Sequence, residues 1–149
     1  MFVLLNLLVA SVMVAVTFSV HFAGLVGLTA LLRHPRVHPG KHSSTLMQGV
    51  SILAVVFSLF ALHSVQIWLY AFVYMALGEL HQVETALYFS TSTFTTVGFG
   101  DVVLSHEWRL LGVAESINGF LLISWSTAFL VSLTARVRAF EEKIEGNDA

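Results

Sequence analysis

The fold is decided by the stretch Ser92-Thr93-Phe94-Thr95-Thr96-Val97-Gly98-Phe99-Gly100-Asp101. In its second half two glycines alternate with Val97 and Phe99, which suits a non-helical backbone with angles that L-residues avoid. The residues before it, Val83–Phe94, carry no charge after Glu84 and are rich in Ser and Thr. They are long enough for a short helix and too short to cross a bilayer. The stretch therefore predicts a short helix ending near Thr95, followed by an irregular segment.

The composition around this stretch is that of an integral membrane protein. Of the 149 residues, 56% are hydrophobic and only 11% are charged, and the mean hydropathy is +0.83. An ordinary soluble domain is less apolar and carries about twice that share of charge. The chain has no cysteine, which excludes disulfides, thiolate metal sites and cysteine nucleophiles.

Three runs are long enough to span a membrane: Phe2–Leu32 and Leu46–Leu77, which are uncharged, and Trp108–Leu133, which contains only Arg109 and Glu115 as charged residues. Each exceeds the roughly 20 residues that a helix needs to cross the hydrocarbon core. We expect the first run to be a retained helix, since it is about twice the length of a signal-peptide core. The prolines of the loop Arg33–His42 end that helix. With three spans, a short helix over Val83–Phe94 at membrane depth must be re-entrant.

The basic residues set the expected orientation. Of the seven Lys and Arg residues, all but Arg109 lie in the first loop or after the third span, and positive charge favours the cytoplasmic side. We therefore expect the N-terminus outside, the C-terminus in the cytoplasm, and a prokaryotic inner (plasma) membrane. The cytoplasmic group is Arg33, Arg36, Lys41, Arg136, Arg138 and Lys143. The acidic residues expected around the outer mouth, where they would concentrate cations, are Glu79, Glu84, Asp101 and Glu107.

An irregular backbone at membrane depth needs a physical reason, because unpaired peptide groups are costly unless they line a water-filled cavity or are buried in protein. Ion coordination supplies one. A strip of successive carbonyls replaces the hydration shell of K⁺ when four copies face one axis. Gly98 and Gly100 permit the alternating backbone that turns those carbonyls the same way. Thr96 would add a hydroxyl at the inner end.

The segment resembles the pore module of the tetrameric potassium channels, whose filter has the pattern TVGYG. Ala86-Leu87-Tyr88-Phe89-Ser90 before it and Asn118-Gly119-Phe120-Leu121-Leu122-Ile123 after it look like the small bacterial two-helix members. The resemblance implies a homotetramer in membrane lipid around a central pore, with K⁺ in the filter and no other cofactor. It does not cover Phe2–Leu32, an extra N-terminal helix that we expect to pack at the periphery. The ion-coordinating carbonyls implied are those of Thr96, Val97, Gly98 and Phe99.

Filter support is where the sequence departs from the family. Phe99 replaces the usual Tyr and cannot donate the hydrogen bond that braces the filter from behind. Ser92 stands where some members carry a Glu that pairs with the filter Asp. The hydroxyl of Tyr88 is expected to bond Asp101 instead and to hold the filter open. Gly100 and Thr95 complete the expected support.

Polar residues inside the spans are candidates for gating. A carboxylate at Glu115 is costly at that depth, and we expect it behind the filter, bonded to Ser90 or Ser92, either as a brace or as a pH sensor. Gly119 takes the place of a flexible glycine of the resembling channels, where close helix packing is an equally good interpretation. Asn118 is expected to bond Glu115.

Two sets of histidines are candidates for proton sensing or metal binding. His63 and Gln66 share a face of the second span, where bonding to a neighbouring helix is favoured over proton sensing. His34, His38 and His42 have the spacing of metal ligands on a helix, but two prolines break that helix, so a solvated loop is favoured. Ser124 and Thr127, about one turn apart on the third span, are expected to face the cavity.

The sequence thus predicts an all-α membrane protein with three transmembrane helices, a re-entrant pore helix and a selectivity filter per subunit. Its expected parts are residues 1–42 (first helix and basic loop), 43–135 (pore domain) and 136–149 (cytoplasmic tail). The expected function is passive, K⁺-selective conduction. The alternatives are a poorly selective monovalent cation channel and a non-conducting membrane subunit that assembles with a partner. No residue set suggests an enzyme, and nothing suggests nucleic-acid binding.

Overall fold

The computed structural model describes residues 2–32 and 45–145, with side chains for 2–32 and 49–135. Its regular structure over these ranges consists of helices: α1 (Phe2–Leu32), α2 (Thr45–Ala76), α3 (Val83–Phe94) and α4 (Arg109–Glu145). The prediction of an all-α protein is confirmed. Only α4 differs clearly from its expected bounds. It continues to Glu145 because residues 136–145 hold good helix formers and neither Gly nor Pro.

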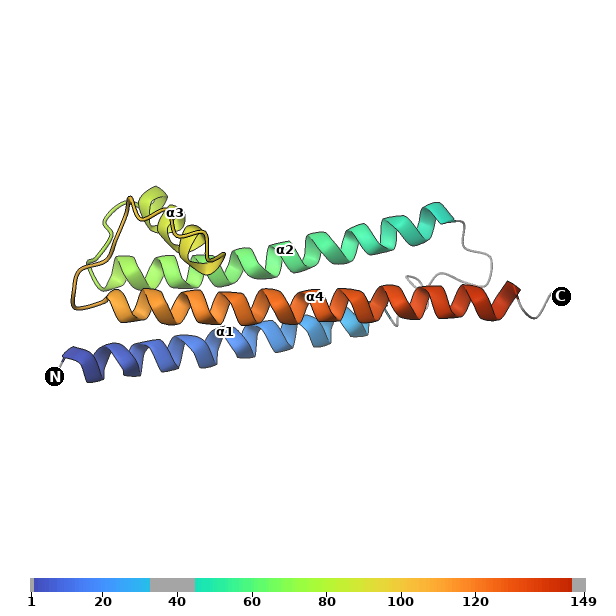
Figure 1. The fold of residues 1–149 in the computed structure, drawn as a ribbon, viewed down its shortest axis with the longest axis horizontal. Helices are drawn as coiled ribbons and strands as arrows, with labels where there is room; N and C mark the ends of the chain where they lie inside the picture. The colour runs from blue at the N-terminus through green and yellow to red at the C-terminus, as the bar shows by residue number, and fades with distance from the viewer. Residues whose placement is uncertain (1, 33–44, 146–149) are drawn as a thin grey trace.

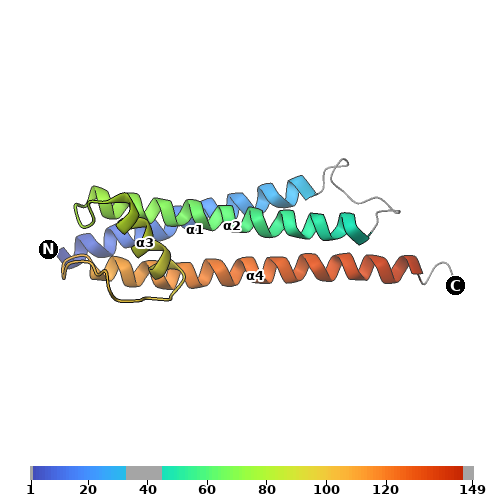
Figure 2. The same cartoon turned by 90° about the horizontal axis from the view of Figure 1, so that it is seen from above.

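The three long helices lie side by side, and α3 packs against one end of the bundle (Figure 1 and Figure 2). The chain descends through α3 toward the middle of the bundle and then returns to the same end before α4 begins (Figure 1). The N-terminus lies at this end and the C-terminus at the other. The short helix therefore has the re-entrant arrangement expected of a pore helix.

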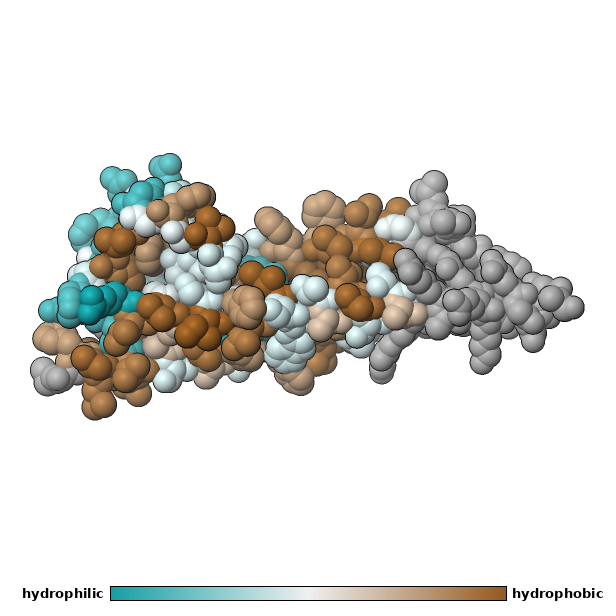
Figure 3. Space-filling model, viewed as in Figure 1, coloured by the Kyte–Doolittle hydropathy of each residue, from teal (hydrophilic) through white to brown (hydrophobic). Residues whose placement is uncertain are grey.

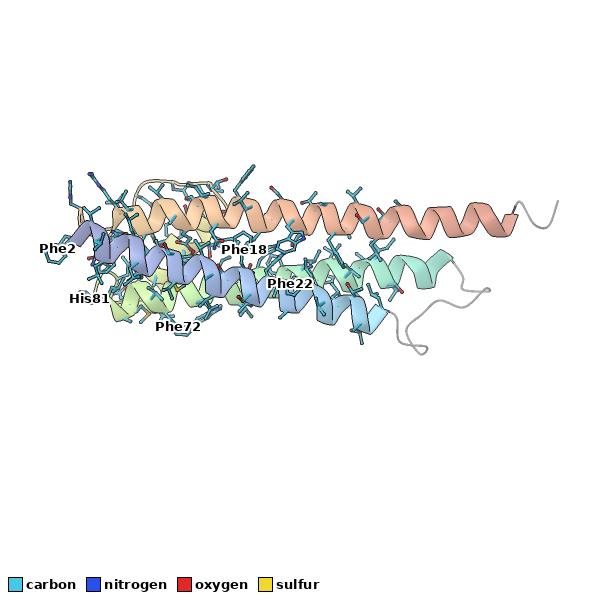
Figure 4. All side chains as sticks on the ribbon, turned by 90° about the horizontal axis from the view of Figure 1, so that it is seen from below. Phe2, Phe18, Phe22, Phe72 and His81 are labelled. Atoms are coloured by element: carbon cyan, nitrogen blue, oxygen red, sulfur yellow. The ribbon has the colours of Figure 1, made fainter. Side chains whose placement is uncertain are left out.

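Three helical segments are long and apolar enough to cross a membrane: Phe2–Leu32, Gly49–Ala76 and Arg109–Ala135, with mean hydropathy values of 2.4, 2.1 and 1.5. Apolar side chains cover much of the length of the described bundle, and hydrophilic ones gather at the α3 end (Figure 3). Phe2, Phe22 and Phe72 lie exposed on the outside of the bundle (Figure 4). The chain is an integral membrane protein with three candidate spans.

The first helix contacts both α2 and α4 of its own chain. Its buried residues recur every three or four positions and so form one stripe along the helix. They are Asn6, Ala10, Met13, Thr17, His21 and Leu25. Lipid tails are as apolar as Leu, so helices in a membrane associate through close packing and interhelical hydrogen bonds. Four of the six residues in this stripe are small or polar, and the stripe therefore explains how α1 is held to the bundle.

Candidate ion-conducting site

The site begins where α3 ends, deep against α2 and α4. The amide of Thr95 donates to the Thr91 carbonyl at 3.1 Å, and the amide of Thr96 donates to the Thr93 carbonyl at 3.0 Å. The Thr95 hydroxyl also donates to the Thr91 carbonyl, at 2.7 Å. These bonds pair the carbonyls of Thr91 and Thr93 in the last turn of α3. The chain leaves the helical path immediately afterwards.

The segment after Thr95 has an alternating backbone. Thr96, Gly98 and Gly100 have positive φ angles of 61°, 57° and 78°, whereas Val97 and Phe99 between them do not. The left-handed region is open to glycine but unfavourable for a β-branched residue, and a residue held there costs about 1–3 kcal/mol. The conformation at Thr96 is therefore one that the surrounding structure must impose.

Ser92 holds two consecutive amides of this segment toward the pore helix. The Gly98 amide donates to the Ser92 carbonyl at 3.1 Å, and the Phe99 amide donates to the Ser92 hydroxyl at 3.2 Å. The sequence predicts Ser92 as a candidate partner of Glu115 and places it where some family members carry a Glu, but it does not predict these two bonds. Its acceptor role comes from a reverse turn of the chain, for which no local sequence signal exists.

Tyr88 bridges the pore helix and the end of the segment. Its hydroxyl donates to Asp101 Oδ2 at 2.8 Å, and its ring stacks on Phe99 with centroids 6.1 Å apart and planes 11° from parallel. The bond to Asp101 raises the pKa of the Tyr88 phenol above its ordinary value, so Tyr88 keeps its donor proton at neutral pH. Phe99, which lacks a hydroxyl, contributes a flat stacking surface instead.

The loop between the segment and α4 is tied to the residues that follow α2. Glu79 accepts hydrogen bonds from the Ser105 amide at 2.7 Å and from the Ser105 hydroxyl at 2.9 Å. At the start of α4, Asn6 of α1 donates to the Glu107 carbonyl at 2.5 Å. Glu79 is thus committed to fixing the loop that follows the segment.

Glu115 lies completely buried behind the pore helix. One of its carboxyl oxygens accepts from Tyr74 at 2.5 Å and the other from Ser90 at 2.5 Å. The Ser90 hydroxyl is also 3.0 Å from the Ile67 carbonyl. Of the two expected serine partners, Ser90 contacts Glu115, while Ser92 faces the segment after α3. The carboxyl group joins α2, α3 and α4.

Gly119 lies where α4 meets the end of α3. A Cβ added there would fall 2.0 Å from the Phe94 carbonyl oxygen and 2.9 Å from its Cα. Because the obstacle is backbone, a side chain at this position requires α3 or α4 to move. Close packing is therefore the arrangement that the structure shows at this glycine. Nearby, the Ser116 hydroxyl donates to the Thr93 carbonyl at 3.0 Å, a contact that sequence reasoning missed.

A hollow of about 360 Å³ opens between the end of α3 and the middle of α4. It includes the two residues expected to face a cavity, Ser124 and Thr127. The residues that line it are Thr95, Thr96, Phe120, Ile123, Ser124 and Thr127. Hydroxyl groups from α4 and from the end of α3 thus lie beside Thr96, the first residue of the segment with a positive φ angle.

The remaining polar predictions have mixed outcomes. Asn118 donates to Thr17 at 2.7 Å and to Tyr70 at 3.0 Å. The expected bond between Asn118 and Glu115 is wrong, because that carboxyl is already paired with Tyr74 and Ser90. His63 contacts Gln66 on its own helix at 2.9 Å and Ser126 of α4 at 3.0 Å, so the expected bonding to a neighbouring helix is confirmed.

Metal ligation finds no support in the part of the chain that the structure covers. His34, His38 and His42 lie outside the described residues. Within residues 2–32 and 49–135, whose side chains the structure describes, no group of three or more His, Asp or Glu side chains is placed to hold a metal ion.

These features belong together in a known kind of protein. A family model described as an ion channel matches residues 49–136, which is more than half of the chain. The chain belongs to this ion channel family. The match takes in α3, the segment after it and nearly all of the two flanking spans, and it leaves out α1. No curated protein and no solved structure gives a significant match. As an ion channel family member the chain is not an enzyme, and proteins of this family are typically oligomeric.

Proposed function

We propose that the chain is one subunit of a homotetrameric, K⁺-selective channel that conducts passively. The observation that carries the proposal is the alternation of φ at Thr96, Gly98 and Gly100. Alternating left- and right-handed residues allow successive carbonyls to face one side, and four such strips replace the hydration shell of K⁺. The ion sites in this proposal are the carbonyls of Thr96, Val97, Gly98 and Phe99, with the Thr96 hydroxyl closing the innermost.

The hydrogen bonds of the segment support this assignment. The amides of Gly98 and Phe99 are directed at Ser92 of the pore helix. With those donors committed to one side, the carbonyls are free to serve as ion ligands on the other. Tyr88 and Asp101 close the outer end, and the Thr95 hydroxyl caps the helix at the inner end.

The exposure of the segment supports assembly. In the single chain Val97 is 56% and Phe99 69% accessible, although both belong to a segment that follows the re-entrant helix α3. Such a surface needs cover from protein or from a water-filled pore. Three further copies around a common axis supply both.

The basic residues fix the proposed orientation, with the pore-helix end of the bundle and the N-terminus outside and the C-terminus in the cytoplasm of a prokaryotic cell. In the proposed organisation, residues 43–135 form the pore domain. Residues 1–42 add the first helix and a basic cytoplasmic loop, and residues 136–149 form the cytoplasmic tail.

One observation favours a second candidate, a poorly selective monovalent cation channel. Phe99 offers no hydroxyl to hold the filter from behind, and its backbone is braced through Ser92 by an exposed bond of 3.2 Å. A filter that widens loses the match between carbonyl spacing and K⁺. The two candidates predict different ion preferences and the same architecture.

The test is flux from the purified full chain in liposomes. An outward K⁺ gradient with a proton-conducting uncoupler should drive uptake of a fluorescent dye, and Ba²⁺ should block it. Gly98→Ala, reconstituted at the same protein density, is the matched control and should be silent. A parent protein without Ba²⁺-sensitive flux would contradict conduction and favour a non-conducting subunit. Equal fluxes of K⁺ and Na⁺ would favour the second candidate.

A further inference from the structure

Four polar side chains from three spans form a closed circuit in the middle of the bundle. They are His21 of α1, His63 and Gln66 of α2, and Ser126 of α4. Gln66 Nε2 is 3.2 Å from His21 Nδ1, and His21 Nε2 is 3.5 Å from Ser126 Oγ. Ser126 Oγ is 3.0 Å from His63 Nε2, and His63 Nδ1 is 2.9 Å from Gln66 Oε1. We call these four residues the polar ring.

The direction of every hydrogen bond in the polar ring follows from one outside contact. Gln66 Nε2 also lies 3.4 Å from the Thr17 carbonyl, an acceptor, which fixes the orientation of the amide. Gln66 then donates to His21, His21 to Ser126, Ser126 to His63, and His63 back to the Gln66 oxygen. Each imidazole donates once and accepts once, as a neutral imidazole does.

The polar ring lies where unpaired groups are costly. His21 and Gln66 are fully buried, and 6% of Ser126 is accessible. The two imidazoles also stack, with centroids 5.4 Å apart. At membrane depth no water replaces a lost partner, so opening the circuit leaves a buried donor and a buried acceptor unpaired. The polar ring therefore fixes α1 relative to α2 and α4.

The polar ring also touches the end of the pore helix. The His63 ring packs on the Phe94 ring with centroids 5.8 Å apart. Phe94 is the last residue of α3 and is completely buried, and its carbonyl abuts Gly119 on the other side. Thr95 and Thr96 follow directly. A shift of the His63 ring would therefore move Phe94, which lies two residues before Thr96, where the candidate filter begins.

We propose that His21 is a positioning residue for the filter, acting from α1 through the polar ring on Phe94. This gives the first helix, which lies outside the family match, a role in ion selectivity in addition to membrane anchoring. The proposal rests on the proposed function. It differs from a purely structural role because it assigns to α1 an effect on the choice between ions.

The test uses Ser126→Ala, which removes the hydroxyl that joins the two imidazoles and changes little volume. In liposomes or planar bilayers the K⁺/Na⁺ permeability ratio of the full chain should fall about fivefold, the equivalent of about 1 kcal/mol for one buried hydrogen bond. Ser126→Thr keeps the hydroxyl and should restore the parent ratio. Ser132→Ala is the matched control on the same helix, since that exposed hydroxyl contacts only the Ala128 carbonyl at 2.9 Å.

His21→Phe supplies a second variant should Ser126→Ala fail to assemble, because it keeps a flat ring and removes both nitrogens. Members of one circuit are not additive. The double variant His21→Phe, Ser126→Ala should therefore lose no more selectivity than the worse single variant. A selective parent with unchanged ratios in Ser126→Ala and His21→Phe overturns the role of the polar ring and leaves the proposed function intact. A parent that conducts no K⁺ overturns both.

Discussion

The candidate filter differs in exposure from the buried polar residues behind it. We call Glu115, Asn118 and their hydrogen-bond partners the polar frame. In the filter, Val97 and Phe99 are largely exposed in the single chain. In the frame, Glu115 and Asn118 are buried and bonded across helices. Most polar groups of the frame are therefore paired within one subunit, with Asn118 Oδ1 as an exception, whereas the filter has a surface that the chain itself does not cover. This difference indicates that the subunit can fold without covering the candidate filter, and in the proposed assembly further copies supply that cover.

The difference also orders the expected costs of mutation. A buried polar group left without a partner costs about 1–3 kcal/mol, while exposed hydrogen bonds contribute less. The bond of Tyr88 to Asp101 and the bonds of Glu79 to Ser105 are exposed. Backbone positions that admit only glycine should be the most sensitive, because no side-chain adjustment relieves them.

The largest effect is expected for Gly98→Ala. An L-residue in the left-handed region costs about 1–2 kcal/mol in each chain, and four copies carry that cost at the same level of the pore. We expect K⁺ flux to be lost while the protein still inserts and assembles. Gly27→Ala, in the first helix with no atom near the added Cβ, should conduct as the parent does. A conducting Gly98→Ala channel with parental selectivity would remove the filter assignment.

The second-largest effect is expected at Gly119, where α4 meets the end of α3 beside the candidate filter. Gly119→Ala places a Cβ 2.0 Å from the Phe94 carbonyl oxygen, so α3 and α4 must separate. We expect reduced conduction together with a lower unfolding temperature of the purified oligomer. The control is Gly112→Ala on the same helix, whose added Cβ meets the Phe89 ring at 3.4 Å. Equal behaviour of the two variants would show that Gly119 serves bending rather than packing.

A third prediction concerns the frame alone. Glu115→Leu leaves the buried Tyr74 hydroxyl without its acceptor and should destabilise the subunit by about 1–3 kcal/mol. Glu115→Gln keeps one acceptor oxygen, and Ser90 can then use the Ile67 carbonyl. We expect the Glu115→Gln variant to fold and to conduct with the same pH response as the parent protein, as measured by flux between pH 5 and 8. A pH response that disappears in Glu115→Gln would make this carboxyl the sensor instead of a brace.

The smallest effect is expected at the exposed end of the filter. Tyr88→Phe keeps the stacking on Phe99 and removes the bond to Asp101, so selectivity and thermal stability should change little. Current during sustained opening should decay faster, because the outer end of the filter is less well held. Single-channel recording measures this decay. Unchanged kinetics would exclude the Tyr88 bond as the brace.

The first two spans were predictable from charge-free length, and the third span and the pore helix from long stretches that are nearly free of charge. The bounds of α1 follow from the first and last residues of such a run, and α3 has the expected bounds Val83–Phe94. The proximity of Ser90 to Glu115 was predictable for a related reason, since a carboxyl group at membrane depth needs donors and the pore helix is rich in hydroxyls. Both inferences use costs that apply whatever the tertiary arrangement.

The partners of α1 were not predictable, because tertiary contacts choose them. Thr17 and His21 belong to a stripe of polar and small residues spaced by three and four, which the uniform hydrophobicity of the helix hides. The stripe marks a buried face but does not identify what covers it. The same limit explains the error at Asn118, whose spacing from Glu115 suggested a bond within the helix whereas its amide bonds Thr17 and Tyr70.

The central claim, a K⁺-selective filter formed by four copies of this chain, is tested most directly by the reversal potential of the purified parent protein in a planar bilayer. With K⁺ on one side and an equal concentration of Na⁺ on the other, we predict a reversal potential far from zero, on the K⁺-selective side. In a tenfold K⁺ gradient it should approach the limit of about 59 mV for a monovalent ion. A reversal potential near zero with K⁺ opposite Na⁺ would contradict the account.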